Sequence, residues 1–329
     1  WKQWIGQWKS IHYYDLKMWI NYWRRSKISA PQCTKRTERA RCMQFEIGRT
    51  SRLGNREVNQ DRLTVIENPH GAVLVLGDGL GGKPGGDLAA QTLVDTIKEE
   101  LTINPLPAEH PEKFLQEIIR RAHHAILLAG QEQDPPVSPG STAVVCLVQN
   151  LKVWWAHVGD SRFYLFRNSL PLYRTQDHSY VEQLYQQGRI SLSKTHDHPM
   201  RNYVTQCIGL FPHEPEIAIS KGTELKEGDI LLLCSDGFFE PLDYDQIGAM
   251  IEKGQLNNAL DALAERAETT SYPHSDNTTA VALRVISLQQ PQPGKQPIKA
   301  KKTRKRETLD DAIAEIERAI KTYEKEMKE

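Results

Sequence analysis

Four aspartates in this 329-residue sequence lie at the ends of apolar, strand-like runs, each with Gly, Ser or Asn beside it. Asp78, Asp160 and Asp236 follow such runs, whereas Asp276 precedes one. A carboxylate at the mouth of a buried strand is costly unless it is hydrogen-bonded or bound to a cation. One such aspartate is typical of a turn, but four indicate strand ends that converge on a metal site. Ligand sets made only of oxygen favour a hard ion, Mg²⁺ or Mn²⁺, over zinc.

The residues around Asp78 could let two ions share one carboxylate. Asp78 lies between Gly77 and Gly79, where the backbone can approach a ligand closely. Its carboxylate can bridge two ions, and the Gly79 carbonyl can add another oxygen. Asp236 and Asp276 would complete the protein ligands of the first ion, and waters would fill the remainder. Two ions about 3.5–4 Å apart can activate a water and neutralise phosphoryl oxygens, which is the chemistry of phosphomonoester hydrolysis.

Strands and helices must bring these aspartates together. Runs rich in Val, Leu and aromatic residues predict strands at 62–67, 72–78, 142–149, 152–158, 162–167, 229–235 and 278–286. Capping and breaking residues predict helices at 87–101, 111–130, 179–188, 243–253 and 255–270. Strands adjoin strands as often as helices, which argues against a strict parallel βαβ sheet. The predicted fold class is α+β, a central sandwich of two antiparallel β-sheets flanked by helices on both faces.

Composition divides the chain into four predicted parts. Residues 1–43 form a basic extension that holds five of the seven tryptophans. Residues 44–287 carry the regular pattern of a catalytic domain. Residues 288–306 are a linker, rich in Pro and Gln and then in Lys. Residues 307–329 form an amphipathic helix whose apolar positions are spaced four and three apart.

Each extension has more than one interpretation. Residues 1–43 are expected to be a mobile tail or non-native upstream sequence, and the alternative is a basic helix at a membrane surface. The linker is expected to be a solvated tether, and the alternative is a patch for an anionic partner. The helix at 307–329 would dock on its own domain or associate with another helix, including one from a second copy.

The bulk properties exclude several classes of protein. The net charge is zero, which gives no electrostatic case for nucleic acid. The five cysteines form no C-x-x-C pair, which is typical of reduced thiols in the cytoplasm. No apolar run approaches 18 residues, so we expect no transmembrane segment, and no signal-peptide pattern is present.

Six short motifs follow one another in the order of a known family. They lie at residues 56–62, 77–82, 140–143, 158–162, 234–237 and 275–278. Together they resemble the metal-dependent protein phosphatases of the 2C type, across about residues 44–286. The stretch from Asp177 to Gly209, with His178 and His198, resembles the flap segment of bacterial members.

The resemblance implies further roles for individual residues. Asp160 would hold a third, weaker ion with help from Asp236. Arg56 matches the arginine that grips the substrate phosphate, a role suited to its fixed fork of donors. Asp61 matches the acid that hydrogen-bonds metal-bound water. Gln60 and Asn277 would lie next to the metal ligands without binding an ion directly.

The sequence departs from the family pattern near this centre. Gln60 stands where the family usually has Glu, which removes a negative charge from the side of the second ion. Leu80 and Lys83 stand where family members carry His. The resemblance therefore assigns no general acid.

Two other functions compete with phosphate-ester hydrolysis. Residues 77–83 nearly match a phosphate-cradling nucleotide loop, but Pro84 lacks the required hydroxyl and N–H. A scaffold that binds phosphoproteins without turnover is the second alternative, supported by Gln60 and opposed by the four retained aspartates. The cluster at 196–198, His-Asp-His, belongs to the expected flap segment and is not predicted to bind metal.

The sequence thus predicts a cytoplasmic protein serine/threonine phosphatase that depends on Mn²⁺ or Mg²⁺. The resemblance implies two ions, with a place for a third, and a hydroxide bridging the pair that attacks phosphorus in line. Its expected partners are phosphorylated proteins and a cognate Ser/Thr kinase system.

Overall fold

The computed structural model describes residues 42–80, 85–195 and 197–289. By contacts the chain divides into two units, Trp1–Pro291 and Gln292–Glu329, and the second lies outside the described residues. The predictions for the basic extension up to residue 41, for the linker from residue 290 and for the helix at 307–329 therefore concern residues outside the description, as do those for Lys83 and His196.

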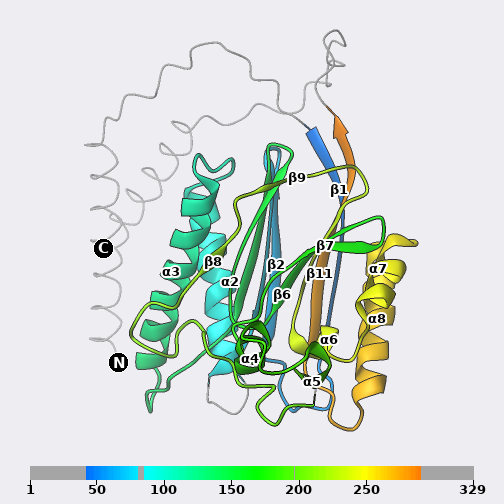
Figure 1. The fold of residues 1–329 in the computed structure, drawn as a ribbon. Coiled ribbons are helices and arrows are strands. Elements are labelled where there is room, and N and C mark those ends of the chain that lie inside the picture. Colours follow the sequence, from blue (N-terminus) through cyan, green and yellow to red (C-terminus); the bar gives the residue numbers. More distant parts are fainter. Residues whose placement is uncertain (1–41, 81–84, 196, 290–329) are drawn as a thin grey trace, which may run out of the picture. The chain divides into compact units, whose positions relative to one another are not determined.

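Two antiparallel sheets form the centre of the fold (Figure 1). In the five-stranded sheet the order is β1 (Cys42–Arg52), β11 (Thr278–Gln289), β10 (Ile230–Cys234), β6 (Arg162–Arg167) and β7 (Leu170–Arg174). In the six-stranded sheet the order is β2 (Asp61–Asn68), β3 (Gly71–Asp78), β4 (Ala143–Gln149), β5 (Lys152–Val158) and β8 (Ala218–Ile219), and β9 (Thr223–Glu224) also pairs with β5.

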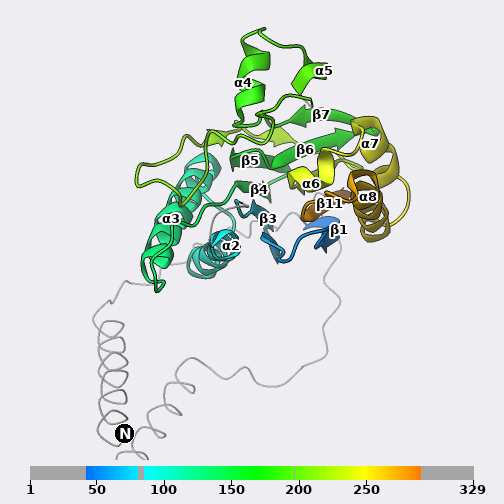
Figure 2. The same cartoon turned by 90° about the horizontal axis from the view of Figure 1, so that it is seen from below.

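Helices cover the outer faces of both sheets, as Figure 2 shows. The six-stranded sheet is covered by α2 (Gly86–Ile103) and α3 (Pro111–Gln131). The five-stranded sheet is covered by α6 (Asp236–Phe239), α7 (Tyr244–Glu252) and α8 (Leu256–Ser271). Two short helices, α4 (Tyr180–Gln186) and α5 (Leu192–Thr195), project from the sandwich in the connection between β7 and β8.

The central strands are apolar throughout because they are buried on both faces. In β3, Leu74 packs between the sheets, whereas Val73 packs under α2 and α3. In β10, Leu231 and Leu233 face the other sheet, and Leu232 faces α8. This alternation makes three apolar layers. One lies between the sheets, one lies under α2 and α3, and one lies under α6, α7 and α8.

The predicted α+β sandwich is confirmed, and all seven predicted strands and five predicted helices are present within three residues of their expected ends. The predicted cap of α4 is also present, since the Glu182 N–H donates to Ser179 Oγ at 3.3 Å. The sequence patterns did not predict β1, β7, β8, β9, α5 or α6. β1 begins at Cys42, two residues before the predicted start of the domain. Among the described residues, no helix has both the length and the apolar character needed to cross a membrane.

The layer between the sheets should carry much of the stability. We expect Leu74→Ala to lower the free energy of unfolding by about 2–5 kcal/mol, because Leu74 is fully buried and its loss leaves a cavity. Leu172→Ala is the control, since Leu172 is 46% exposed on edge strand β7, and it should cost less than about 0.5 kcal/mol. Urea unfolding followed by circular dichroism measures both values. Equal losses at the two positions would contradict the assignment of this layer as the core.

Candidate active site

A pocket of about 380 Å³ opens at the end of the sandwich where the chain leaves β1, β3, β5 and β10 and enters β2, β6 and β11. Most of the residues that the sequence singled out line it: Arg56, Gln60, Asp78, Gly79, Asp160, Asp236, Asp276 and Asn277. Val58, Leu80, Thr142, Asn202 and Val204 complete the lining. The structure thus brings together side chains that are up to 221 positions apart, from Arg56 to Asn277.

Backbone contacts place Asp78 at the floor of this pocket. Asp78 is the last residue of β3, and its N–H donates to Thr142 Oγ1 at 2.9 Å. Its carbonyl accepts from the Thr142 N–H at 2.8 Å. The next residue must be glycine, because a Cβ on Gly79 would lie 2.2 Å from the carbonyl oxygen of Gly86 at the start of α2.

Tight turns orient Asp236 and Asp276. Asp236 Oδ1 accepts from the Gly237 N–H at 2.6 Å, and Asp276 Oδ1 accepts from the Asn277 N–H at 2.8 Å. The two turns pack against each other so closely that a Cβ on Gly237 would lie 2.2 Å from the Asn277 carbonyl oxygen. In each carboxylate, Oδ1 is therefore held by a backbone N–H, which leaves Oδ2 for another partner.

Arg56 is the positively charged side chain among the described residues that line this pocket. Its Nη2 lies 2.7 Å from Asp276 Oδ2, and both side chains are partly exposed. Asn277 ties the neighbouring loops together, since its Oδ1 accepts from the Gln60 N–H at 2.9 Å and its Nδ2 donates to the Leu53 carbonyl at 2.8 Å. These contacts fit the predicted supporting position of Asn277.

Asp61 lies opposite Asp78 in the β2–β3 register and is only 2% exposed. Its Oδ2 accepts from Ser235 Oγ at 2.9 Å. Its Oδ1 has no hydrogen-bond partner among the described residues. A buried carboxylate oxygen without a partner is costly, so this atom fits a position beside a bound cation or a water held by one.

The clustered carboxyls oppose one another's ionisation. Burial, and then the charges of Asp61, Asp236 and Asp160, raise the pKa of Asp78 well above its usual range. Burial and the nearby Asp160 do the same to the pKa of Asp236. Burial raises the pKa of Asp61 and of Asp160 to about 7 each. Hard divalent cations would relieve this repulsion, and carboxylate oxygens are the ligands they prefer.

The described side chains contain no group of three His, Cys, Asp or Glu residues arranged to hold an ion as they stand. Asp276 is ion-paired with Arg56, and Asp236 and Asp276 each bond to a neighbouring backbone N–H. The residues nevertheless suit Mg²⁺ or Mn²⁺, because they present oxygen donors and because a cation would relieve the repulsion between their carboxylates. The roles assigned to each of them remain predictions.

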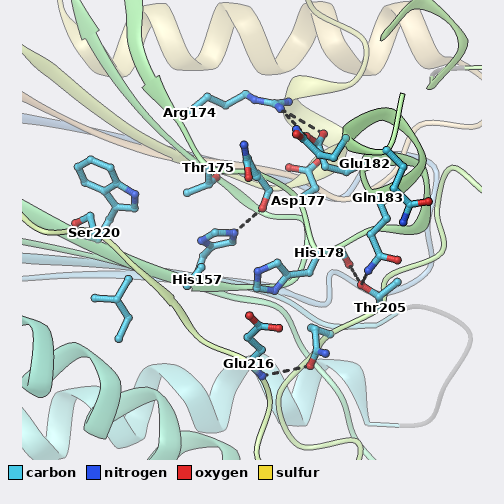
Figure 3. A pocket seen from close by; sticks show the side chains of 17 residues that line it. His157, Arg174, Thr175, Asp177, His178, Glu182, Gln183, Thr205, Glu216 and Ser220 are labelled. Atoms are coloured by element: carbon cyan, nitrogen blue, oxygen red, sulfur yellow. Dashed lines mark hydrogen bonds and ion pairs between the residues drawn. The ribbon is translucent and has the colours of Figure 1, made fainter. Parts of the chain in front are cut away.

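The two flap histidines do not line this pocket. His178 lines a separate cavity of about 630 Å³ on the β5 side of the sandwich (Figure 3). His198 lies in a turn after α5, where its Nδ1 accepts from the Met200 N–H at 3.1 Å. Asp197 and His198 lie outside the strands.

Thr142 is a pocket residue that the sequence did not single out by itself. Its Oγ1 contacts both the Asp78 N–H and Ser161 Oγ, at 2.9 and 2.7 Å. It therefore connects the turn of Asp78 with the turn of Asp160. The motif at 140–143 carried the signal, but only the pairing of β3, β4 and β5 shows which side chains Thr142 reaches.

An acidic pocket with one arginine, at the end of a double-sheet sandwich, defines a candidate metal-dependent hydrolase of phosphate esters. Comparison with known protein families identifies the family to which this hydrolase belongs. The family model described as protein phosphatase 2C matches residues 49–278. The chain belongs to this family.

Individual relatives agree with this assignment. The serine/threonine phosphatase stp of Listeria monocytogenes serotype 4b (strain F2365) is 30% identical over 240 residues, which cover 71% of this chain and 92% of the relative. The serine/threonine protein phosphatase PstP of Mycobacterium tuberculosis is 28% identical over 218 residues, which cover 65% of this chain and 40% of PstP.

Solved structures show the same fold. The crystal structure of Stp1 from Staphylococcus aureus superposes with a TM-score of 0.67 at 28% identity, covering 75% of this chain and 96% of Stp1. The catalytic domain of PstP, in complex with two manganese ions, gives a TM-score of 0.63 at 25% identity and covers 74% of this chain and 100% of that one. The predicted family, fold and enzyme class are confirmed, and the nucleotide-binding alternative is not favoured.

The raised carboxyl pKa values predict how the metal-free protein responds to pH. Folded Asp61, with a pKa of about 7, keeps a proton that an unfolded aspartate with the ordinary value of 3.8 has released. The stability of the metal-free fold should therefore fall as pH rises from about 4 to about 7. Asp61→Asn should flatten this slope, and saturating Mn²⁺ should remove it, because the ions hold the carboxylates deprotonated.

Thermal melts in chelator between pH 4 and pH 8 measure this slope. The control is Asp261→Asn, on the exposed face of α8, which should leave the slope unchanged. A slope in Asp61→Asn as steep as in the wild type would contradict the assignment.

Proposed function

We propose that this chain hydrolyses phosphoserine and phosphothreonine in proteins, with two Mn²⁺ or Mg²⁺ ions held by Asp78, Gly79, Asp236 and Asp276. The observation that carries the proposal is the pocket in which these residues converge with Arg56. Family membership and the named phosphatases among the relatives support the same reaction. When bound, the ions supply a nucleophilic water at neutral pH and neutralise charge on the phosphoryl oxygens.

Arg56 binds the phosphate of the substrate in this scheme. Its side chain is 51% exposed at the pocket, where a phosphoryl group can reach it. A guanidinium presents parallel N–H donors that match two phosphate oxygens. Arg56 therefore orients the phosphorus and offsets charge on the oxygens that do not react.

The same arginine links phosphate binding to metal binding. In the structure Arg56 and Asp276 neutralise each other across 2.7 Å. A cation on Asp276 would take over this carboxylate and leave the guanidinium available for phosphate. Binding a metal ion and binding the substrate should thus support each other.

Asp61 acts on the attacking water. Ser235 Oγ fixes one of its oxygens at 2.9 Å, while the other has no partner among the described residues. The unpaired oxygen can accept a hydrogen bond from the water and orient it toward phosphorus, or take up its proton. The structure assigns no general acid, because the described lining contains no histidine.

The setting of the enzyme is a further part of the proposal. We infer a cytoplasmic phosphatase that opposes a cognate Ser/Thr kinase system. Cys146 and Cys234 are buried thiols outside any disulfide, which supports a reducing compartment. The weakly catalytic scaffold is the second candidate, and Gln60 in the pocket lining is the observation that favours it.

Removal of a metal ligand tests the proposed function. We expect Asp236→Asn to lower kcat/KM for p-nitrophenyl phosphate and for a phosphothreonine peptide by roughly 100-fold or more, because several kcal/mol of charge stabilisation is lost. Chelation of the wild type should have the same effect, and added Mn²⁺ should reverse it. Asp261→Asn, which removes the same charge from an exposed helix face, should retain activity. Activity that survives both chelation and Asp236→Asn would exclude the mechanism.

Gln60 gives the second test, which asks whether this residue lies beside the metal site. We expect Gln60→Glu to raise Mn²⁺ affinity about fivefold, since a charge near a partly exposed ion contributes on the order of 1 kcal/mol. Glu should be tolerated there, because the amide of Gln60 packs beside Gly86 at the N-terminus of α2, where a negative charge is favourable. Isothermal titration calorimetry measures the affinity. Gln116→Glu on the exposed face of α3 is the control, and an unchanged affinity in Gln60→Glu would remove Gln60 from the metal site.

A further inference from the structure

The turn that carries Asp160 is joined to His178 by two hydrogen bonds. The Gly159 N–H donates to His178 Nδ1 at 3.3 Å, and the His178 N–H donates to the Gly159 carbonyl at 2.9 Å. One bond uses the imidazole ring and the other uses the backbone. Asp160 follows directly, so its carboxylate is set by a turn that His178 holds.

The opposite side of this turn is closed by Thr142. Gly159 has φ +104°, and a Cβ on it would lie 2.7 Å from Thr142 Cγ2. Ser161, on the far side of Asp160, contacts Thr142 Oγ1 at 2.7 Å. The turn is therefore held by Thr142, just before β4, and by His178.

His178 also fixes the base of the flap, residues 177–209. Its carbonyl accepts from the Thr205 N–H at 2.7 Å and from Thr205 Oγ1 at 2.9 Å. The next residue, Ser179, caps α4 and pairs with Val204, which lines the acidic pocket. The outgoing and returning segments of the flap thus meet at His178, where Figure 3 shows its contact with Thr205, and the same residue holds the Asp160 turn.

The His178 ring is in the form that this contact requires. It packs on His157 with ring centroids 4.7 Å apart, and His157 Nε2 is itself held by the Gln176 carbonyl at 2.8 Å. Burial, with help from His157, lowers the pKa of His178 to about 4. The ring is therefore neutral near pH 7, and Nδ1 can accept the Gly159 N–H while Nε2 carries the proton.

We propose that His178 is a positioning residue for Asp160, and that it couples the conformation of the flap to the ion that Asp160 binds. The inference rests on the proposed function for the identity of that ion. It adds a residue that touches neither metal nor substrate, and it gives a physical route from the flap to the metal centre through Gly159.

Direct measurement of Mn²⁺ binding tests the coupling without relying on turnover. Calorimetry of the chelator-stripped protein resolves the weak ion, identified as the one lost in Asp160→Asn. We expect His178→Ala to weaken this ion by about 10–100-fold, the usual effect of removing a residue that supports a ligand. The tighter ions should be affected less, because Asp78, Asp236 and Asp276 do not depend on Gly159 for their hydrogen bonds.

Two replacements separate the ring contact from general packing. Asn places its side-chain oxygen where His178 Nδ1 lies, so His178→Asn should retain the weak ion. Gln places its oxygen at the level of Nε2, away from the Gly159 N–H, so His178→Gln should behave like Ala. The matched control is His123→Ala, because His123 is a buried histidine whose Nδ1 likewise accepts a glycine N–H, that of Gly209 at 3.1 Å. Its loss should lower the melting temperature without changing the weak-ion affinity.

Three results would overturn the inference. They are an unchanged weak ion in folded His178→Ala, a loss in His178→Asn as large as in His178→Ala, and the absence of any ion that Asp160→Asn removes. If the wild type binds its ions but hydrolyses no phosphopeptide, the proposed function fails, while the isotherms still decide the role of His178.

Discussion

Mutual repulsion among carboxylates at one end of the sandwich is the constraint on which the rest of the site depends. Burial and neighbouring charge raise the pKa of Asp78 and Asp236 well above the ordinary range. A fold can keep such a cluster only if protons or cations neutralise it and if rigid elements prevent the side chains from separating. The antiparallel sheets meet the second condition, since each aspartate lies within two residues of a strand end. Stability of the metal-free domain is thereby reduced in favour of ion binding.

The rigidity comes from small residues and hydroxyls between the turns. Gly79 and Gly237 allow backbones to approach to distances that any Cβ would prevent. Thr142 and Ser235 then join neighbouring turns, Thr142 between those of Asp78 and Asp160, and Ser235 between Asp61 and β11. Each hydroxyl has at least two partners, which leaves it few alternative positions. Because the sheets fix these contacts, small displacements of the aspartates are opposed from several directions.

Local signals explain which parts the sequence could predict. Strands buried on both faces read as continuous apolar runs, so β3, β4 and β10 were recognisable. β1 was missed because much of it is polar and it pairs only along one edge, with β11, and β7 because Pro171 and its exposed side chains weaken the strand pattern. The aspartates were visible as residues at strand ends. The contact of Arg56 with Asp276, and that of His178 with Gly159, join positions distant in sequence and follow from tertiary packing alone.

The pairing of Arg56 with Asp276 shows how the site can hold several carboxylates before metal ions bind and still accept those ions. Both side chains are well exposed, at 51% and 38%, so the pair contributes at most about 1 kcal/mol. A divalent cation carries twice the charge of the guanidinium, so its binding to the same carboxylate would outweigh the loss of this ion pair. The pair thus limits repulsion before the ions bind and does not oppose their entry. In the proposed scheme, the released Arg56 would remain in the pocket lining and offer its donors to the phosphate of the substrate.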